Sequence, residues 1–218
     1  MELLRQIDGY CERVGPEYWG EPVNAVTNAG FVIVAILMWR RSAGTPLASA
    51  LAVVLGLIGV GSYLFHTHAQ VWAAIADVAP ILGFILLYIF AINRDVLALR
   101  TLPALGLTGL FFPYAALTIP LWQHVPLYGT SAGYMPVPTL ILIYAGFLWR
   151  RKPALARGFV LGAVILLISL AARGLDEPLC QALPRGTHFL WHILNAIMLG
   201  WMIEVYSRHA LEGGKTAR

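Results

Sequence analysis

Long apolar stretches, separated by short polar breaks, follow one another through the sequence from about residue 23 onward. A helix needs about 20 apolar residues to cross the hydrocarbon core of a bilayer, because it rises only about 1.5 Å per residue. The stretches are continuously apolar, so they lack the alternating pattern of a membrane β-barrel. We therefore expect an all-α integral membrane protein, a bundle of seven transmembrane helices with spans at residues 23–39, 46–66, 71–92, 102–121, 134–149, 158–173 and 187–206.

The composition supports a membrane location. Hydrophobic residues make up 59% of the chain and charged residues only 12%, whereas soluble domains carry about 25% charged residues. The formal net charge is +4, but the sequence has neither a basic run with interleaved aromatic residues nor a glycine-rich phosphate loop. We therefore predict a multi-pass protein of a bacterial inner membrane or an endomembrane, and we expect no nucleic-acid partner.

Lysine and arginine are distributed unevenly between the two sides of the predicted bundle. The side that follows the odd-numbered spans holds eleven of them, and the opposite side holds four, Arg5, Arg13, Arg173 and Arg185. Because positively charged loops remain in the cytoplasm, we expect the N-terminus outside and the C-terminus in the cytoplasm. We divide the chain into an outer acidic segment (residues 1–22), a transmembrane domain (23–206) and a cytoplasmic tail (207–218).

Prolines interrupt two of the predicted spans. Pro103, Pro113 and Pro120 lie around the fourth span, and Pro136 and Pro138 lie in the fifth. Proline lacks the backbone N–H of a helical hydrogen bond, and its ring clashes with the preceding turn. We therefore expect these two helices to be kinked or short.

Polar and ionisable side chains gather at one end of the predicted bundle. His66 lies at the outer end of the second span, one helical turn beyond Ser62, and Asp77 lies near the outer start of the third. His188 and His192 open the seventh span, four residues apart and therefore on one helix face. An ionisable side chain in the bilayer costs about 3 kcal/mol, so such residues normally face the bundle interior and serve a function. We expect these five residues to form one site.

Three neutral histidines with an open fourth position are typical of a catalytic zinc ion. Zinc in such a shell lowers the pKa of a bound water to about 7. Asp77 would then take and return a proton, and Ser62 would donate a hydrogen bond to the oxyanion that forms at an attacked carbonyl. The residue types therefore favour hydrolysis of an amide or an ester, with His66, His188 and His192 as zinc ligands.

Six segments follow one another in an order that is specific when taken together: Tyr10-Cys11-Glu12, Glu21-Pro22-Val23-Asn24 with Asn28, Gly61-Ser62-Tyr63-Leu64-Phe65-His66, Asp77-Val78-Ala79-Pro80, Leu175-Asp176 with Cys180, and His188-Phe189-Leu190-Trp191-His192. From about residue 9 to residue 204, the chain resembles the alkaline ceramidases. They belong to a superfamily of seven-helix membrane hydrolases that includes the adiponectin and progestin receptors.

The resemblance implies an intramembrane zinc amidase that cleaves ceramide, or a similar N-acyl lipid, to a sphingoid base and a fatty acid. It implies the same roles for the three histidines, for Asp77 and for Ser62. It also implies a calcium site at the outer side, built from Glu12 and Glu21, with Asp8 close by.

The two cysteines provide an independent prediction. Cys11 precedes the first predicted span and Cys180 lies in the loop before the seventh, so the topology places both outside. Disulfides persist in an oxidising compartment. We expect a Cys11–Cys180 bond that ties the N-terminal segment to the loop presenting His188, and the alternative is two free thiols.

Other functions fit the same residues less well. A non-catalytic seven-helix lipid receptor or sensor would hold zinc as a closed, structural ion. A haem or copper electron carrier would leave Ser62 and Asp77 without a role. Transport finds no support, because the sequence has neither an internal repeat nor paired broken helices.

Overall fold

The computed structural model describes residues 2–216, which are mainly helical and contain one isolated antiparallel bridge, between Gln6 and Gln70. The α-helices are α1 (Pro22–Thr27), α2 (Ala29–Arg41), α3 (Pro46–His68), α4 (Val71–Ala91), α5 (Thr101–Gly109), α6 (Phe111–Trp122), α7 (Pro136–Leu148), α8 (Pro153–Gly174) and α9 (His188–Thr216). The shorter elements are the 3-10 helices η1 (Glu2–Leu4), η3 (Gly129–Tyr134) and η4 (Glu177–Leu179) and the π-helix η2 (Ile92–Val96).

Six helical segments among the described residues are long and apolar enough to cross a membrane. They are Pro22–Arg41, Pro46–His68, Val71–Val96, Thr101–Trp122, Pro153–Gly174 and His188–Leu211. The remaining predicted span, residues 134–149, corresponds to α7, which has only 13 residues. At about 1.5 Å per residue, such a helix is shorter than the hydrocarbon core of about 30 Å. The last helix, by contrast, continues beyond the predicted boundary at residue 206 to Thr216.

Two of the predicted spans are interrupted. The first is divided at Asn28. The side-chain amide of Asn28 donates to the backbone oxygen of Asn24 at 2.8 Å, and so competes for the oxygen that the backbone N–H of Asn28 would bond in a continuous helix. The fourth is divided at Leu110, between α5 and α6. Proline at position 113 cannot donate to the carbonyl of Gly109, so the regular pattern of bonds fails at this point.

Proline also sets where several helices begin. Pro22, Pro46, Pro136 and Pro153 each occupy the first turn of their helix. The first residues of a helix have no intrahelical partner for their N–H groups, so proline costs nothing there. The short helix α7 therefore begins at one of the two prolines expected to shorten it.

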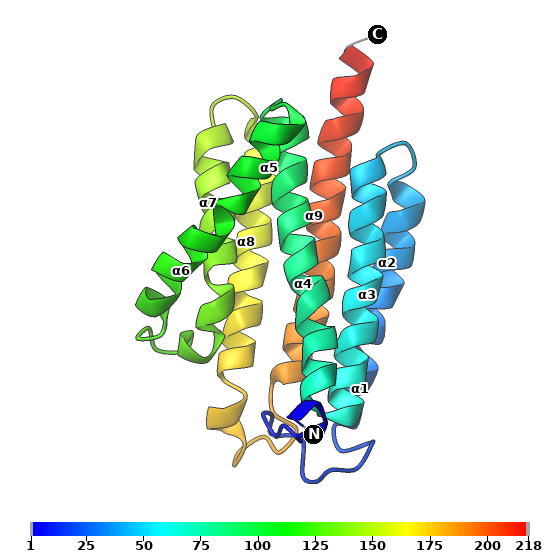
Figure 1. Cartoon of the computed structure of the whole chain (residues 1–218), viewed down its shortest axis with the longest axis vertical. Coiled ribbons are helices and arrows are strands. Elements are labelled where there is room, and N and C mark those ends of the chain that lie inside the picture. Colours follow the sequence, from blue (N-terminus) through cyan, green and yellow to red (C-terminus); the bar gives the residue numbers. More distant parts are fainter. Residues whose placement is uncertain (1, 217–218) are drawn as a thin grey trace.

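The helices form an elongated bundle, shown in Figure 1. Helix α3 packs against α2 and α4, and α9 packs against α2 and α8, with α7 on the other side of α8. The core between them contains large buried side chains, among them Phe31, Leu51, Phe159 and Tyr206. Helices α5 and α6 make few contacts with the others, and in Figure 1 α6 leans outward from the bundle.

One end of the bundle, which we call the N-terminal face, carries residues 2–21. The C-terminal ends of α3 and α8 and the N-terminal ends of α4 and α9 meet there, and the C-terminal end of α9 lies at the opposite end (Figure 1). The segment is attached to the α3–α4 turn, because Ile7 donates its N–H to Ala69 at 2.7 Å and Arg5 accepts from Val71 at 3.1 Å. The N-terminal segment therefore covers the end at which the sequence places its polar residues.

Candidate metal centre

Three histidines meet at the N-terminal face. His66 lies near the end of α3, and His188 and His192 lie one turn apart at the start of α9. Each is at most 2% exposed, and one ligand atom from each ring lies within 4.8 Å of the others. Within residues 2–216, this is the one group of His, Cys, Asp or Glu side chains that lies close enough together to share a metal ion.

Two of these rings are held from one side by hydrogen bonds. Oε2 of Glu21 lies 2.6 Å from Nδ1 of His66, and Oγ1 of Thr27 lies 2.9 Å from Nδ1 of His192. Glu21 immediately precedes α1 and Thr27 ends it, so this short helix supplies both partners. Such partners fix the tautomer and the orientation of metal-binding histidines. Both rings therefore present Nε2 as the nitrogen available to an ion.

The donor set fits a metal ion. Nδ1 of His188 and Nε2 of His192 are buried and have no hydrogen-bond partner among the described residues. Buried polar atoms are nearly always paired, so two unpaired imidazole nitrogens in one cluster require an explanation. An ion bound by three imidazoles would satisfy both atoms, and imidazole is a preferred ligand of zinc and of several other transition metals.

Glu21 is an ionised carboxylate inside the protein. Burial raises its pKa, but the hydrogen bond and charge of His66, and hydrogen bonds from Arg13 and Asn24, lower the pKa below its ordinary value. Its side chain is only 2% exposed and accepts from Nε of Arg13 at 2.6 Å through its second oxygen. Glu21 thus connects a buried guanidinium to a histidine of the cluster.

Ser62 and Asp77 come from adjacent helices and lie beside the histidines. Asp77 is close enough to Ser62 and to His66 to interact with both. Oγ of Ser62 and Oδ1 of Asp77 are both buried. The close approach depends on Gly61, because a Cβ atom there would lie 2.1 Å from the backbone oxygen of Ala76. Glycine therefore allows α3 and α4 to touch next to the site.

Two further residues, which the sequence did not single out for the site, border the cluster. The ring of Tyr10 stacks on His188, with 3.6 Å between ring centroids and an interplanar angle of 20°. Burial raises the pKa of Tyr10, although nearby Arg173 opposes this, so the phenol is neutral at physiological pH. Arg173, at the end of α8, also donates to Thr130 at 2.8 Å and interacts with Asp77. A tyrosine hydroxyl and a guanidinium thus lie near the proposed reacting groups.

The loop before α9 is tied to the N-terminal segment by a covalent bond and a carboxylate. Cys11 and Cys180 form the predicted disulfide, with 5.2 Å between their Cα atoms. Asp176 is 2% exposed and accepts from the backbone N–H groups of Cys11 at 3.0 Å and His188 at 2.8 Å. Both connections hold the first residue of α9, a histidine of the cluster, against the N-terminal segment.

The predicted calcium site receives no support from the geometry. Both oxygens of Glu12 accept from backbone N–H groups, of Val23 and Asn24, at 2.7 Å each. Glu21 binds Arg13 and His66 instead. Asp8 is exposed and joins neither carboxylate in a group that could share an ion, among the residues described. Glu12 thus fixes the N-terminal segment to α1, and Glu21 fixes the ring of His66.

Comparison with known proteins agrees with this arrangement. No curated protein matched the chain. The family model of the ceramidases, however, matches residues 7–216, a range that includes the N-terminal segment and every helix from α1 to α9. A match over nearly the whole length shows that the chain belongs to the ceramidase family.

Proposed function

We propose that this protein is a zinc-dependent intramembrane amidase that hydrolyses the N-acyl bond of ceramide or of a similar lipid amide. The observation that carries the proposal is the cluster of three buried histidines, whose ligand atoms lie within 4.8 Å of one another beside Ser62 and Asp77. Membership of the ceramidase family implies a hydrolase that acts on amide bonds. The products would be a fatty acid and a sphingoid base or other amine.

Each residue of the site has a defined role in this proposal. Zinc held by the three histidines would supply a Lewis acid and lower the pKa of a water molecule. Asp77 takes the proton of the water that attacks the carbonyl carbon, and it returns a proton to the amine as the C–N bond breaks. Ser62 donates a hydrogen bond to the oxyanion that forms at the attacked carbonyl. Their location supports these roles, because Asp77 interacts with both Ser62 and His66 beside the histidine cluster.

Two adjacent apolar cavities offer a place for the lipid chain. The first is lined by Phe31 and Trp191, whose rings lie 6.2 Å and 5.4 Å from that of His192. The second reaches further along the bundle to Tyr88 and Met202. The two share four lining residues, Ile85, Val137, Met198 and Leu199. We propose that the acyl chain extends from the histidine cluster along these residues into the bundle.

The cavity next to the histidines also has polar atoms for the head of the substrate. Nε1 of Trp191 and Oδ1 of Asn195 are buried and unpaired among the described residues, and both side chains line this cavity. One is a donor and the other an acceptor. They would bind the amide or the hydroxyl groups of a lipid whose carbonyl lies at the metal.

We also propose that the chain crosses the membrane seven times, with the N-terminal face outside. The distribution of lysine and arginine favours this orientation. The disulfide at that face supports it, since disulfides persist outside the cytoplasm. In this arrangement α7 crosses with the help of η3, which precedes it. The alternative, in which α7 enters the bilayer only part of the way, would place the two termini on the same side.

The proposal is tested by metal analysis of the purified protein together with a hydrolysis screen of lipid amides, with and without chelator. We expect about one zinc per chain, turnover that chelation abolishes, and recovery on adding zinc. His188→Ala should lose both metal and turnover, whereas Asp77→Asn should keep the metal and lose turnover. Zinc without turnover of any lipid amide would favour the receptor alternative, and a protein that binds no metal would overturn the proposal.

A further inference from the structure

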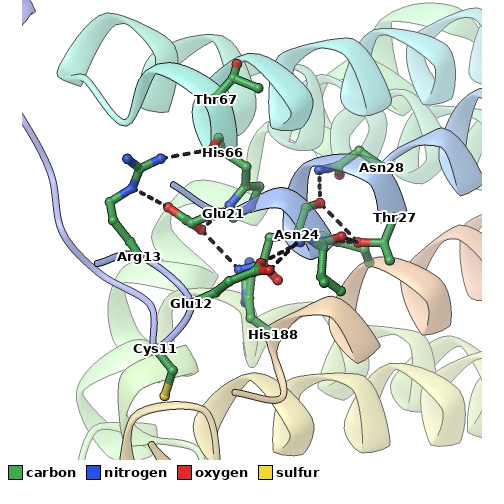
Figure 2. Close-up of polar contacts among 12 residues, drawn as sticks. Cys11, Glu12, Arg13, Glu21, Asn24, Thr27, Asn28, His66, Thr67 and His188 are labelled. Carbon is green, nitrogen blue, oxygen red and sulfur yellow. Dashed lines mark hydrogen bonds and ion pairs between the residues drawn. The ribbon is translucent and has the colours of Figure 1, made fainter. Parts of the chain in front are cut away.

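The N-terminal segment contains a buried cation that belongs to the chain itself. The side chain of Arg13 is only 3% exposed, although it lies between η1 and α1, outside any helix. Its Nε donates to Oε1 of Glu21 at 2.6 Å, and its Nη2 donates to the backbone oxygen of His66 at 2.9 Å. Figure 2 shows the guanidinium of Arg13 and its dashed contacts to Glu21 and His66. A buried charge is stable only when it is paired and hydrogen-bonded, and both conditions are met here.

The other terminal nitrogen of the guanidinium, Nη1, also faces oxygen atoms. Nη1 lies 2.9 Å from the backbone oxygen of Gly15 and 3.4 Å from that of Glu17. Four oxygen atoms, one from a carboxylate and three from backbone carbonyls, therefore surround one positive group. Convergent carboxylate and carbonyl oxygens are the ligands that proteins offer to a hard cation such as calcium.

The local backbone leaves room for this group. A Cβ atom on Gly20 would lie 2.7 Å from Nη1 of Arg13, and 3.0 Å from the oxygen of Gly15. Any other residue at position 20 would therefore press on the guanidinium or on the oxygens around it. The segment is shaped around an arginine side chain, and a bound dication would have to displace it.

We infer that Arg13 is a built-in cation that takes the place of a bound metal in the N-terminal segment, so that this segment assembles without calcium. The oxygen cage of Glu21, Gly15, Glu17 and His66 is thus a cation site filled by the chain's own guanidinium. Of the two acidic residues that suggested a calcium site, Glu21 thus binds the guanidinium, and both oxygens of Glu12 accept from backbone N–H groups.

Arg13 is also a positioning residue for the histidine cluster. It holds the backbone of His66 directly, and it holds the ring through Glu21, whose other oxygen lies 2.6 Å from Nδ1. Removing partners of this kind typically weakens metal binding by about 10- to 100-fold. This part of the inference rests on the proposed function only in taking His66 as a metal ligand.

The first test uses the unaltered protein. Full-length protein in detergent is measured for calcium retention by equilibrium dialysis and for melting temperature, in calcium-free buffer and in millimolar calcium chloride. We expect no stoichiometric calcium and no change in melting temperature. Calcium retained at one ion per chain, with a rise in melting temperature, would overturn the inference.

The second test removes the cation and returns it as a small molecule. Arg13→Ala should melt at a lower temperature and retain zinc about 10- to 100-fold more weakly. Low-millimolar guanidinium chloride should reverse both effects, a result opposite in sign to its action as a denaturant, while sodium chloride at equal ionic strength should not. Arg13→Lys should fall between the wild type and Arg13→Ala, because one ammonium cannot reach all four oxygens.

Arg5→Ala is the matched control, because Arg5 lies in the same segment with an exposed side chain. It should behave as the wild type and should gain nothing from guanidinium. Arg13→Ala with unchanged stability and zinc retention, or with losses that guanidinium does not reverse, would overturn the inference. If Arg13→Ala does not fold, the calcium test on the wild type still decides. None of these measurements requires lipid hydrolysis, so they remain informative even if the amidase proposal fails.

Discussion

Oδ1 of Asp176 accepts a hydrogen bond of 2.8 Å from the backbone N–H of His188, the first residue of α9. The same oxygen accepts from Thr187 at 2.6 Å, and Oδ2 accepts from Cys11 at 3.0 Å. One buried carboxylate therefore caps the helix that carries two histidines of the cluster and binds the N-terminal segment as well. The position of His188 depends on a residue that lies twelve positions earlier in the chain.

Asp176→Asn is expected to lower stability and weaken metal retention. Asparagine has one acceptor oxygen, so it can keep the bonds to α9 or the bond to Cys11, but not both. A buried donor left without its partner costs about 1–3 kcal/mol. The melting temperature and the zinc content after dialysis check this. Glu177→Gln, one position later and exposed, is the control and should change neither.

Much of the fold could be predicted from the sequence, because a bilayer requires long apolar helices. The positions of His66, His188 and His192 followed from helical spacing, and the structure does bring them together. The positions at which the helices are interrupted were harder to predict. Leu110, where the fourth span divides, is as apolar as its neighbours, and only the prolines nearby indicate an interruption.

The surroundings of the histidines could be predicted less well, because they come from irregular segments. Glu21 was assigned to calcium from the family resemblance, but its neighbours in space are Arg13 and His66. No periodic pattern relates residue 13 to residue 66. A single arginine among Glu12, Glu17 and Glu21 is the signal that could have indicated a buried ion pair.

Thr27→Val tests the hydrogen bond that orients His192. Valine has nearly the shape of threonine, but it cannot replace the oxygen that lies 2.9 Å from Nδ1 of the ring. Zinc affinity should fall by about 10- to 100-fold while the protein remains folded. A competition titration with a zinc chelator measures this.

Thr118→Val is the matched control for that substitution, since Oγ1 of Thr118 donates to the backbone oxygen of Tyr114 in its own helix, α6, at 2.9 Å. Its zinc affinity should equal that of the wild type. Equal affinities in both variants would mean that Thr27 does not orient the ring.

Loss of the disulfide should loosen the N-terminal segment. Cys11 and Cys180 are 169 positions apart in the sequence, and disulfides that close long loops contribute about 2–5 kcal/mol. Cys11→Ala combined with Cys180→Ala should lower the melting temperature and, because Tyr10 stacks on His188, should weaken zinc retention.

The control for the cysteine variant is treatment with a reducing agent. The reduced wild type should show the same losses, and the same treatment should not lower the melting temperature of the double variant further. A double variant as stable as the oxidised wild type would show that the remaining contacts, including that of Asp176, are sufficient.

Gly61→Ala tests whether the contact between α3 and α4 sets the geometry of Ser62 and Asp77. A methyl group at position 61 would lie 2.1 Å from the backbone oxygen of Ala76, so the two helices must separate. Overpacking of this kind costs about 1–3 kcal/mol. Turnover of the lipid amide should fall more than zinc content, because the histidines are on α3 and α9 whereas Asp77 is on α4.

Gly83→Ala is the matched control on α4, since a Cβ atom there meets nothing within 4 Å. If Gly61→Ala retains full turnover, Ser62 and Asp77 do not act together across this contact, because the shift would have to separate them.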